Sequence, residues 1–445
     1  MTKKKIAIYL FYLNLTVIFV LFGGPHFYTK TLVLFLAIPL YILTGDRYKL
    51  PAHTKLFFIL TVSLIIIQLI PLPQNLLKII SPGTYLSTIK PLENIGLILE
   101  NSWHPISVVP ANTLFYLGTT FTVFVFYYFA YTVISKDRDN FIFFILFSSG
   151  TILFTVLNEI IMKIFRCKTI YCFTLERKHH FGQFINDNFA ADYFAMILFI
   201  VTAYAVSRSK YKNKIIFFIL ATTIYLSILI TLSRASIIIS SILLLFFFGK
   251  RIIKNGINKT NTIIIGLMTI IILSEIFFIH PKNITKELET ARVEMNNPVV
   301  RKNIYQTTIE IFKDFPVLGS GLDTYREISP KYQQLLNKIW LTYSDSDWVQ
   351  FTAEGGIIFF IIIITFLFSS ARFQRNKKFP SNYENYIRGI NYAMTFMMFH
   401  AFFAYPFYFP LTLIYFFTIL GIRDGFIVHK QLSSKNQSSM KTRRI

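Results

Sequence analysis

The sequence predicts an all-α polytopic membrane protein with about 12 transmembrane helices. Of its 445 residues, 54% are hydrophobic and only 15% are charged, whereas a soluble domain is about 25% charged. The mean hydropathy is +0.52. This composition argues against a soluble enzyme, a disordered chain and a free nucleic-acid binder, so we expect no nucleic acid among the partners and expect membrane lipid around the protein.

Low-charge apolar runs give the expected spans, because about 20 apolar residues cross a hydrocarbon core of about 30 Å. No small-residue cleavage site follows the first run, so an uncleaved span is favoured over a secretory signal. The uncharged stretch 389–422 would make a helix of ~51 Å, so Pro406 and Pro410 predict a hairpin of two spans. The runs lie near 6–22, 27–44, 56–72, 107–134, 141–162, 189–206, 215–232, 235–249, 262–280, 349–370, 385–405 and 407–422.

The distribution of basic residues predicts the orientation. Twelve spans place both termini on one side, and the segments on that side hold 27 of the 45 Lys+Arg but only 5 of the 22 Asp+Glu. That side therefore carries +22 of the net charge of +23, which the positive-inside rule assigns to the cytoplasm. The opposite, outer side is nearly neutral, so any anion recognition there depends on a few placed cations.

We expect residues 1–445 to form a single integral membrane domain with three outer-face loops, 72–106, 163–188 and 281–347, and a disordered cytoplasmic tail, 430–445. The prolines of 72–106 predict an irregular or partly interfacial loop. In 281–347, apolar residues from Ile304 to Phe315 recur at helical spacing and stop at Pro316, and those from Tyr332 to Trp340 recur again. Two amphipathic helices on the outer leaflet would satisfy both patterns; a surface linker without a role is the alternative.

Cysteine usage leaves two possibilities open. Cys167 and Cys172 are the only two cysteines, and in an oxidising compartment they would close a small disulfide loop. Two unrelated thiols fit the sequence equally well. Neither a CxxC motif nor a Cys/His cluster indicates a structural metal site.

Polar residues at the outer ends of the spans are the strongest functional signal, because burying them near lipid costs free energy. Arg234 lies in a tight turn between two apolar runs and could bind a phosphate through bidentate hydrogen bonds; a snorkelling anchor is the alternative. Asn158, Glu159 and Glu275 lie near outer ends of other spans, where they either function or simply reach the interface.

Two further segments bring polar side chains to the start of a span. The first contains Gln183, Asn186 and Asn188, which could bind a sugar or phosphate at a helix N-terminus; N-capping by Asp187 or Asn188 is the alternative. The second suits binding of a sugar hydroxyl, and one of its aspartates could act as a general base, although capping of the tenth span explains them too. Its polar and aromatic residues are Asp345, Asp347, Trp348, Gln350 and Glu354.

The order of these motifs resembles the O-antigen ligase and polymerase superfamily of bacterial membrane glycosyltransferases. The likeness spans roughly residues 105–370. Its elements are the Gly-x-Phe-x-Asn-x-Asn-like segment 182–188, the Ser233-Arg234 turn, Arg301 at the opening of the long loop, a Pro-x-x-Gly-x-Gly at 316–321, and a closing element from Asp345 to Gly355.

The resemblance implies a GT-C-type architecture in the bacterial cytoplasmic (inner) membrane, with the active site on the outer, periplasmic face. It implies a polyprenyl-diphosphate-linked glycan donor, typically on undecaprenyl, a glycan or lipid-linked acceptor, and neither a metal ion nor another cofactor. Carried over to this chain, Arg234 and Arg301 would stabilise the diphosphate leaving group, and Asp345 would take the catalytic position. Two guanidiniums can neutralise such a group without a divalent ion.

One departure from the family pattern affects the function. The family has a histidine where this chain has Asp345. A carboxylate can be a general base, so transfer is retained, but the change favours a polysaccharide polymerase over the lipid A-core ligase. His179, His180 and His280 also lie on the outer side, with no predicted relation to Asp345. A non-enzymatic 12-span transporter or flippase of polysaccharide precursors is the alternative, for which we would expect internal repeats and mid-membrane polar residues.

Overall fold

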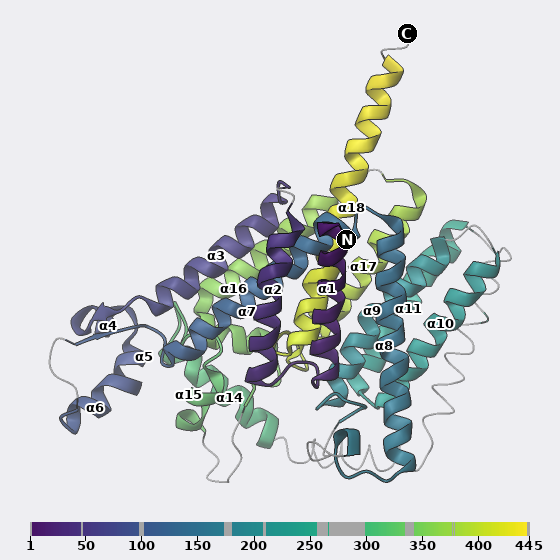
Figure 1. Cartoon of the computed structure of the whole chain (residues 1–445). Coiled ribbons are helices and arrows are strands. Elements are labelled where there is room, and N and C mark those ends of the chain that lie inside the picture. The colour runs from purple at the N-terminus through teal and green to yellow at the C-terminus, as the bar shows by residue number, and fades with distance from the viewer. Residues whose placement is uncertain are drawn as a thin grey trace.

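Apolar runs bounded by prolines, glycines and charges fold into helices that stand side by side (Figure 1). The computed structural model describes residues 2–45, 48–97, 102–172, 180–207, 211–255, 299–333, 342–375 and 379–442, together with Gly266 and Lys377. In these ranges the one sheet is a two-stranded antiparallel pair, β1 (Leu72–Pro73) and β2 (Trp103–His104). The all-α fold class is confirmed.

Eight helices within the described ranges are long and apolar enough to cross a membrane, which makes the chain a polytopic membrane protein. Three more helices, α1 (Lys3–Val20), α11 (Arg234–Asn255) and α17 (Ser381–His400), coincide with expected spans. The run 262–280 lies outside the described residues except for Gly266, so the count of twelve stays a prediction. The eight are α2 (Phe27–Thr44), α3 (Ala52–Leu69), α7 (Pro110–Phe129) with the π-helical turn η2 (Ala130–Ile134), α8 (Arg138–Ile164), α9 (Asp187–Ser207), α10 (Tyr211–Thr231), α16 (Asp347–Gln374) and α18 (Pro410–Thr442).

Two helices form the centre of the bundle. Every residue in the apolar stretch of α9 is buried, and so are 94% of the residues in the apolar stretch of α18. Helices that are apolar all round are the ones that a bundle can surround completely. Neighbours of α9 include α8, α10, α11, α17 and α18.

The expected hairpin near Pro406 and Pro410 is present. Helix α17 ends at His400, a 3₁₀ turn η4 covers Pro406–Tyr408, and α18 begins with Pro410 at its first position, where a proline costs the helix no hydrogen bond. Residues 430–442, for which we expect a disordered tail, lie in the continuation of α18 to Thr442.

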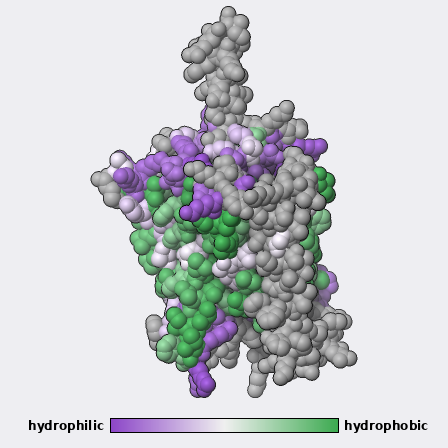
Figure 2. All heavy atoms as spheres, turned by 90° about the vertical axis from the view of Figure 1, so that its right-hand side faces the viewer, coloured by the Kyte–Doolittle hydropathy of each residue, from purple (hydrophilic) through white to green (hydrophobic). Residues whose placement is uncertain are grey.

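Loops and short helices gather at one end of the bundle, which we call the loop face. It carries α4 (Gln74–Ile80), α5 (Pro82–Thr84), η1 (Tyr85–Ile89), α6 (Lys90–Asn94), α14 (Val299–Asp314) and α15 (Tyr325–Tyr332), while the chain ends lie away from it (Figure 1). Figure 2 shows hydrophobic side chains in a band between hydrophilic zones on one side of the molecule. A band of this kind suits a bilayer.

Two expectations about the loops need correction. The segment 72–106 is not irregular but folds mainly into the short helices α4 to α6. The helix expected before Pro316 is present as α14, yet its apolar side packs on protein: Ile311 and Phe315 are buried in one cluster with Tyr325 and Ile328 of α15. The second helix, α15, ends at Tyr332, near where the second pattern begins; most of that pattern, 334–341, lies outside the described residues.

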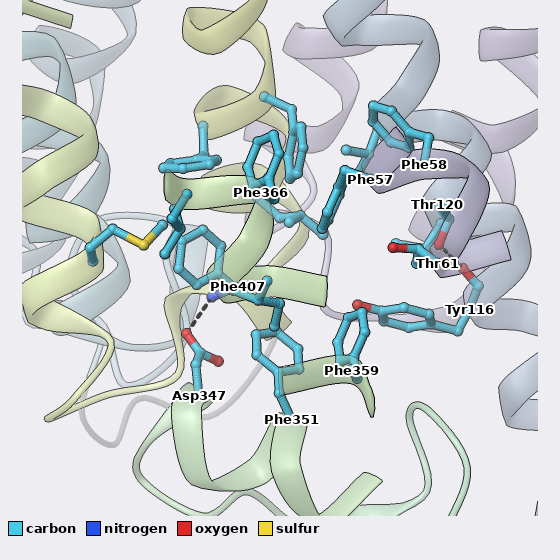
Figure 3. Close-up of a pocket in the computed structure, with 18 of the residues that line it drawn as sticks. Phe57, Phe58, Thr61, Tyr116, Thr120, Asp347, Phe351, Phe359, Phe366 and Phe407 are labelled. Atoms are coloured by element: carbon cyan, nitrogen blue, oxygen red, sulfur yellow. Dashed lines mark hydrogen bonds between the residues drawn. The ribbon is translucent and has the colours of Figure 1, made fainter. Parts of the chain in front are cut away.

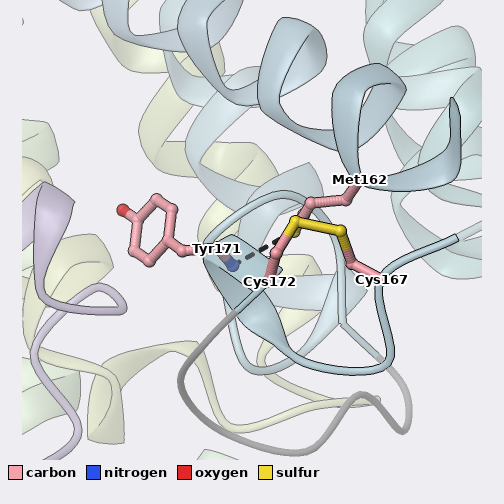
Figure 4. The surroundings of a disulfide bond; sticks show 4 residues. All are labelled: Met162, Cys167, Tyr171 and Cys172. Carbon is pink, nitrogen blue, oxygen red and sulfur yellow. Dashed lines mark hydrogen bonds between the residues drawn. A yellow bond between two sulfur atoms is a disulfide. The ribbon is translucent and has the colours of Figure 1, made fainter. Parts of the chain in front are cut away.

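A disulfide joins Cys167 and Cys172, whose Cα atoms are 4.9 Å apart (Figure 4). Between them, the Tyr171 N–H donates to the Met162 sulfur at 3.3 Å, and the Tyr171 hydroxyl donates to the Val20 carbonyl at 2.8 Å. The disulfide reading of the two cysteines is therefore confirmed, and the small loop that it closes ties the end of α8 to the end of α1.

Candidate active site

The long loop enters a break in helix α16. Gly356 has φ of +64° and ψ of −171°, which divides α16 into two helical pieces. Around the break, the Ser320 N–H donates to the Ala353 carbonyl at 3.1 Å, and the Ile357 N–H donates to the Pro316 carbonyl at 2.9 Å. The segment 316–321 thereby satisfies backbone groups that the break would leave without partners.

Glycine is required at two positions of this junction. A Cβ on Gly319, whose φ is +75°, would lie 2.1 Å from the Glu354 carbonyl oxygen, and a Cβ on Gly356 would lie 2.1 Å from the Val317 carbonyl oxygen. Any larger residue would push the two backbones apart. The Pro-x-x-Gly-x-Gly and Glu-Gly-Gly patterns are thus two sides of one backbone contact.

The Glu354 side chain holds the loop in place. It is 1% exposed, and its carboxylate accepts hydrogen bonds from the backbone N–H groups of Asp323 at 2.8 Å and Tyr325 at 2.9 Å. The Tyr408 hydroxyl at 2.5 Å and the Gln350 amide at 3.2 Å donate to the same carboxylate. A carboxylate at the start of α15 also interacts favourably with the helix dipole.

Gln68, near the end of α3, reinforces the same junction. Its amide nitrogen donates to the carbonyls of Leu318 at 2.6 Å and Glu354 at 3.0 Å, and its amide oxygen accepts from the Leu322 N–H at 3.1 Å. One fully buried side chain therefore joins α3, the loop and α16. The junction is a rigid floor at the loop face.

A cavity of about 550 Å³ opens beside this floor. Five charged residues line it, and two of them, Lys30 and Asp323, lie 3.9 Å apart as a partly exposed ion pair. A pocket of this size holds a drug-sized ligand. Its lining residues are Pro25, Phe27, Lys30, Leu34, Ala111, Asn112, Leu114, Phe115, Gly118, Asp323, Tyr325, Arg326, Glu327, Thr342, Tyr343, Gln350 and Glu354.

The two carboxyl groups from the loop have raised pKa values. Burial raises the pKa of Asp323 above its ordinary value of 3.8, against the opposing charge of Lys30. Burial likewise raises the pKa of Glu327, although Asn112 and Arg326 oppose the shift. Both groups therefore protonate at a higher pH than free carboxyls do, and the cavity becomes more positive as the pH falls.

Asp345 lies next to this cavity in a strained turn. It is half-buried and has φ of +57°, a conformation that is uncommon outside glycine and concentrates at functional sites. Burial and then the nearby charge of Asp345 raise the pKa of Tyr405, whose ring stacks on that of Tyr343 at 4.2 Å. The charge of Asp345 also contributes to the raised pKa of Tyr325. Since Tyr325 and Tyr343 line the cavity, Asp345 is placed at its edge.

Asp347 and Trp348 are directed toward the helix bundle. Asp347 is 1% exposed, and its carboxylate accepts from the Phe407 N–H at 2.9 Å. Figure 3 shows this bond beside a second, apolar cavity of about 80 Å³, in which Phe351 and Phe407 also lie. The Trp348 indole N–H donates to the Met398 carbonyl at 3.2 Å. This second cavity is small and almost entirely apolar, so it offers no chemistry of its own.

The residues expected near the start of α9 divide into two groups. The Gln183 amide is buried and donates to the Thr155 hydroxyl of α8 at 3.0 Å. The Asn186 side chain accepts from the Asn188 N–H at 2.8 Å, as a capping residue does. Asn188 instead reaches across to the turn before α11, where its side-chain amide oxygen accepts a hydrogen bond from the Ser233 hydroxyl at 2.6 Å. Arg234, the next residue, begins α11 with an exposed side chain.

Other expected residues are only partly described. Arg301 lies in the first turn of α14, but its side chain is outside the described part of the chain. His179, Glu275 and His280 also lie outside it. Glu159 accepts from the Gly182 N–H at 3.0 Å, which anchors the 182–188 segment to α8. The structure therefore places Gln350 and Glu354 in the cavity wall, Asp345 two residues after the wall residue Tyr343, and Asn188 at the Arg234 turn.

The sequence reasoning missed several cavity residues. Asp323, Arg326 and Glu327 follow the second glycine of the Pro-x-x-Gly-x-Gly segment within six residues, and that proximity was an available signal. Lys30 was a second one, because it is the only charged residue in the apolar run 27–44. Asn112 and Tyr343 gave no signal, since nothing in the pattern shows that α7 faces the loop.

The fold and this site define a polytopic α-helical membrane protein with a charged cavity built by a long loop at one end. A family model described as O-antigen ligase matches residues 215–364. The resemblance to the O-antigen ligase and polymerase superfamily is thereby confirmed, and the matched range contains Arg234, Arg301, Asp345 and the loop junction at Glu354. Among curated proteins, none matches the chain.

Proposed function

We propose that this protein is a metal-independent membrane glycosyltransferase of the O-antigen polymerase or ligase type. It would transfer a glycan from a polyprenyl diphosphate to an acceptor hydroxyl. The observation that carries the proposal is the cavity at the loop face, whose walls include Lys30 and Arg326 and whose floor is built by the family-matched segment. Cations beside sugar-sized space suit a diphosphate-linked sugar.

In the proposed reaction, the acceptor oxygen forms a bond to the anomeric carbon of the donor sugar while the bond from that carbon to the diphosphate oxygen breaks. The Asp345 carboxylate takes the acceptor proton. The electron pair of the broken bond leaves on the polyprenyl diphosphate, and Arg234 and Arg301 stabilise its charge. Asn186, Asn188, Asp347 and Gln183 would support this site indirectly, by holding in place the segments that carry Arg234 and Asp345 through the contacts described above.

Orientation follows from charge and from the disulfide. We propose that the loop face is the outer, periplasmic face, because the opposite face carries almost all of the excess positive charge. The Cys167–Cys172 bond supports this placement, since structural disulfides persist in oxidising compartments. Chain extension by a polymerase is favoured over transfer to lipid A core, because Asp345 replaces the family histidine.

The test is a transfer assay with purified protein in lipid nanodiscs and a polyprenyl-diphosphate-linked oligosaccharide. Arg234→Ala and Arg301→Ala should each lower kcat by about 100-fold or more, since removing one oxyanion-stabilising donor costs about that much. Arg388→Ala is the matched control, because Arg388 pairs with Glu384 at 3.1 Å on a different helix, α17. Asp345→Asn should remove the pH dependence that the base confers together with most of the activity.

The products of this assay distinguish glycosyl transfer from transport of the lipid-linked substrate. A transporter or flippase would move the lipid-linked substrate across the membrane without forming a new glycosidic bond. Elongated or transferred glycan in the product, lost in both arginine variants but not in Arg388→Ala, supports glycosyl transfer. Translocated but chemically unchanged substrate would overturn it, and full activity of Arg234→Ala and Arg301→Ala would overturn the assignment of the site.

A further inference from the structure

A row of buried polar side chains lies beneath the Arg234 turn. The Ser233 hydroxyl is 3.0 Å from the Ser236 hydroxyl, which is 3.1 Å from His400 Nε2. His400 Nδ1 is in turn 2.8 Å from Asp192 Oδ1, an ion-pair distance without the alignment of a hydrogen bond. The exposed fractions are 4% for Ser233, 0% for Ser236, 1% for His400 and 0% for Asp192. We call these four residues the polar row.

The polar row joins three helices just below the loop face. Asp192 is in the second turn of α9, Ser236 is in the first turn of α11, and His400 is the last residue of α17. Ionisable groups inside membrane helices are costly and mark functional positions by default. None of these side chains lines either cavity described above.

The residue that the polar row can position is Arg234. The turn before it is tight, because Leu232 has φ of +61°, a strained conformation that persists only where its surroundings hold it. The Ser233 hydroxyl is within hydrogen-bond distance of both Asn188 and Ser236. The backbone is therefore fixed one residue before Arg234 and two residues after it, while the arginine side chain itself stays exposed.

The same turn of α17 also holds the segment that carries Asp345. The carbonyl of Ala401, directly after His400, accepts from the Asp347 N–H at 3.0 Å and from the Ser346 hydroxyl at 3.2 Å. The last residue of α17, His400, and the residue after it, Ala401, thus contact the Arg234 turn on one side and the Asp345 turn on the other.

We propose that the end of α17 sets the separation between Arg234 and Asp345, and that Ser236, His400 and Asp192 are positioning residues for Arg234. This inference rests on the proposed glycosyl transfer for its kinetic consequence, but the separation itself is measurable without activity. His400 lies outside the family-matched range 215–364. The end of α17, which sets the separation between Arg234 and Asp345, therefore belongs to the part of the chain that follows this range.

The structural test measures the distance between spin labels on Arg234→Cys and Asp345→Cys. The two native cysteines are paired with each other, so the labels report only on the introduced positions. Adding Ser236→Ala or His400→Phe should broaden or shift the distance distribution. Ser240→Ala is the matched control, because Ser240 is fully buried one turn further along α11 and its hydroxyl donates to the Ile237 carbonyl of the same helix at 3.1 Å. Distributions identical to that of the parent in both variants would overturn the proposal.

The kinetic test uses the protein without introduced cysteines or spin labels, in a double-mutant cycle. Ser236→Ala should lower kcat about 10-fold with little change in KM. When Arg234 is already alanine, the same substitution should change kcat less than about 2-fold. Equal losses in the two backgrounds would overturn positioning through Arg234. Absence of any glycosyl transfer by the parent would defeat the proposed function, while the spin-label distances would still decide the positioning.

Discussion

Replacement of Glu354 by glutamine tests whether a single side chain holds the loop on α16. Glutamine has the shape of glutamate but replaces one acceptor oxygen with an NH₂ group, which only donates. In the native protein each carboxylate oxygen receives two donors: Tyr325 N–H and Gln350 on one, Asp323 N–H and Tyr408 on the other. The amide can keep one of these pairs and must lose the other.

The magnitude follows from what the lost pair contains. Either pair consists of one backbone N–H and one side-chain donor. The side-chain donor can turn to another acceptor, but the backbone N–H cannot, and a buried donor left without a partner costs about 1–3 kcal/mol. We therefore expect Glu354→Gln to lower the free energy of unfolding by about 2–3 kcal/mol, a large share of the ~5–15 kcal/mol that holds an ordinary domain folded.

The assay is thermal unfolding of the purified protein in detergent, combined with limited proteolysis of the 316–333 segment. Glu310→Gln is the control, because Glu310 is partly exposed on α14 and pairs with Lys313, a surface ion pair worth about 0–1 kcal/mol. Glu354→Gln should melt several degrees lower than the control and should be cut sooner. Equal melting temperatures within about 1 °C, with an uncut loop, would refute the reasoning.

Three further predictions concern the loop face. Gly319→Ala should destabilise the protein more than Gly96→Ala. Both glycines have positive φ, but a Cβ on Gly319 would lie 2.1 Å from another backbone atom, whereas a Cβ on Gly96 would meet open space. Equal losses in melting temperature would contradict this steric argument. Asp323→Asn should be more stable than the native protein near pH 7, and the difference in stability should shrink on acidification. The pKa of Asp323 is raised in the folded protein, so its protonation stabilises the fold below the ordinary value of 3.8, and this stabilisation is lost as the pH rises through the raised pKa. A variant less stable than the native protein near neutral pH would contradict this expectation. Replacing Cys167 and Cys172 with serine should cost about 2 kcal/mol from the entropy of so short a loop, and an unchanged melting temperature would show that the loop is held by Tyr171 alone.

The spans could be predicted because lipid imposes one requirement on every one of them. A run such as 189–206 must be helical and apolar, and α9 matches it within a few residues. The tail after residue 430 shows the limit of that reasoning. Its serines and lysines suit solvent whether or not they are helical, so composition alone did not reveal that α18 continues to Thr442.

The site could be predicted only where residues are close in sequence. Asp345, Gln350 and Glu354 lie on one segment, and in the structure Gln350 and Glu354 line the cavity while Asp345 follows two residues after the lining residue Tyr343. Lys30 and Asn112 come from α2 and α7 and meet Asp323 only after the bundle has assembled. His400 is more instructive: as a lone histidine in an apolar run it gave no signal, and its contacts with Asp192 and Ser236 cross more than 160 positions of the chain.

The Gln68 contacts have a consequence for how the protein is made. Gln68 belongs to the third helix to emerge, yet its amide partners on Leu318 and Glu354 are 250 and 286 positions later in the chain. At about 5–20 residues per second, synthesis needs roughly 13–50 s to deliver Leu318. During that interval the first helices must shelter an amide that lacks its final partners. A chain truncated before residue 318 would lack both of these partners, so the Gln68 amide could not form its final contacts.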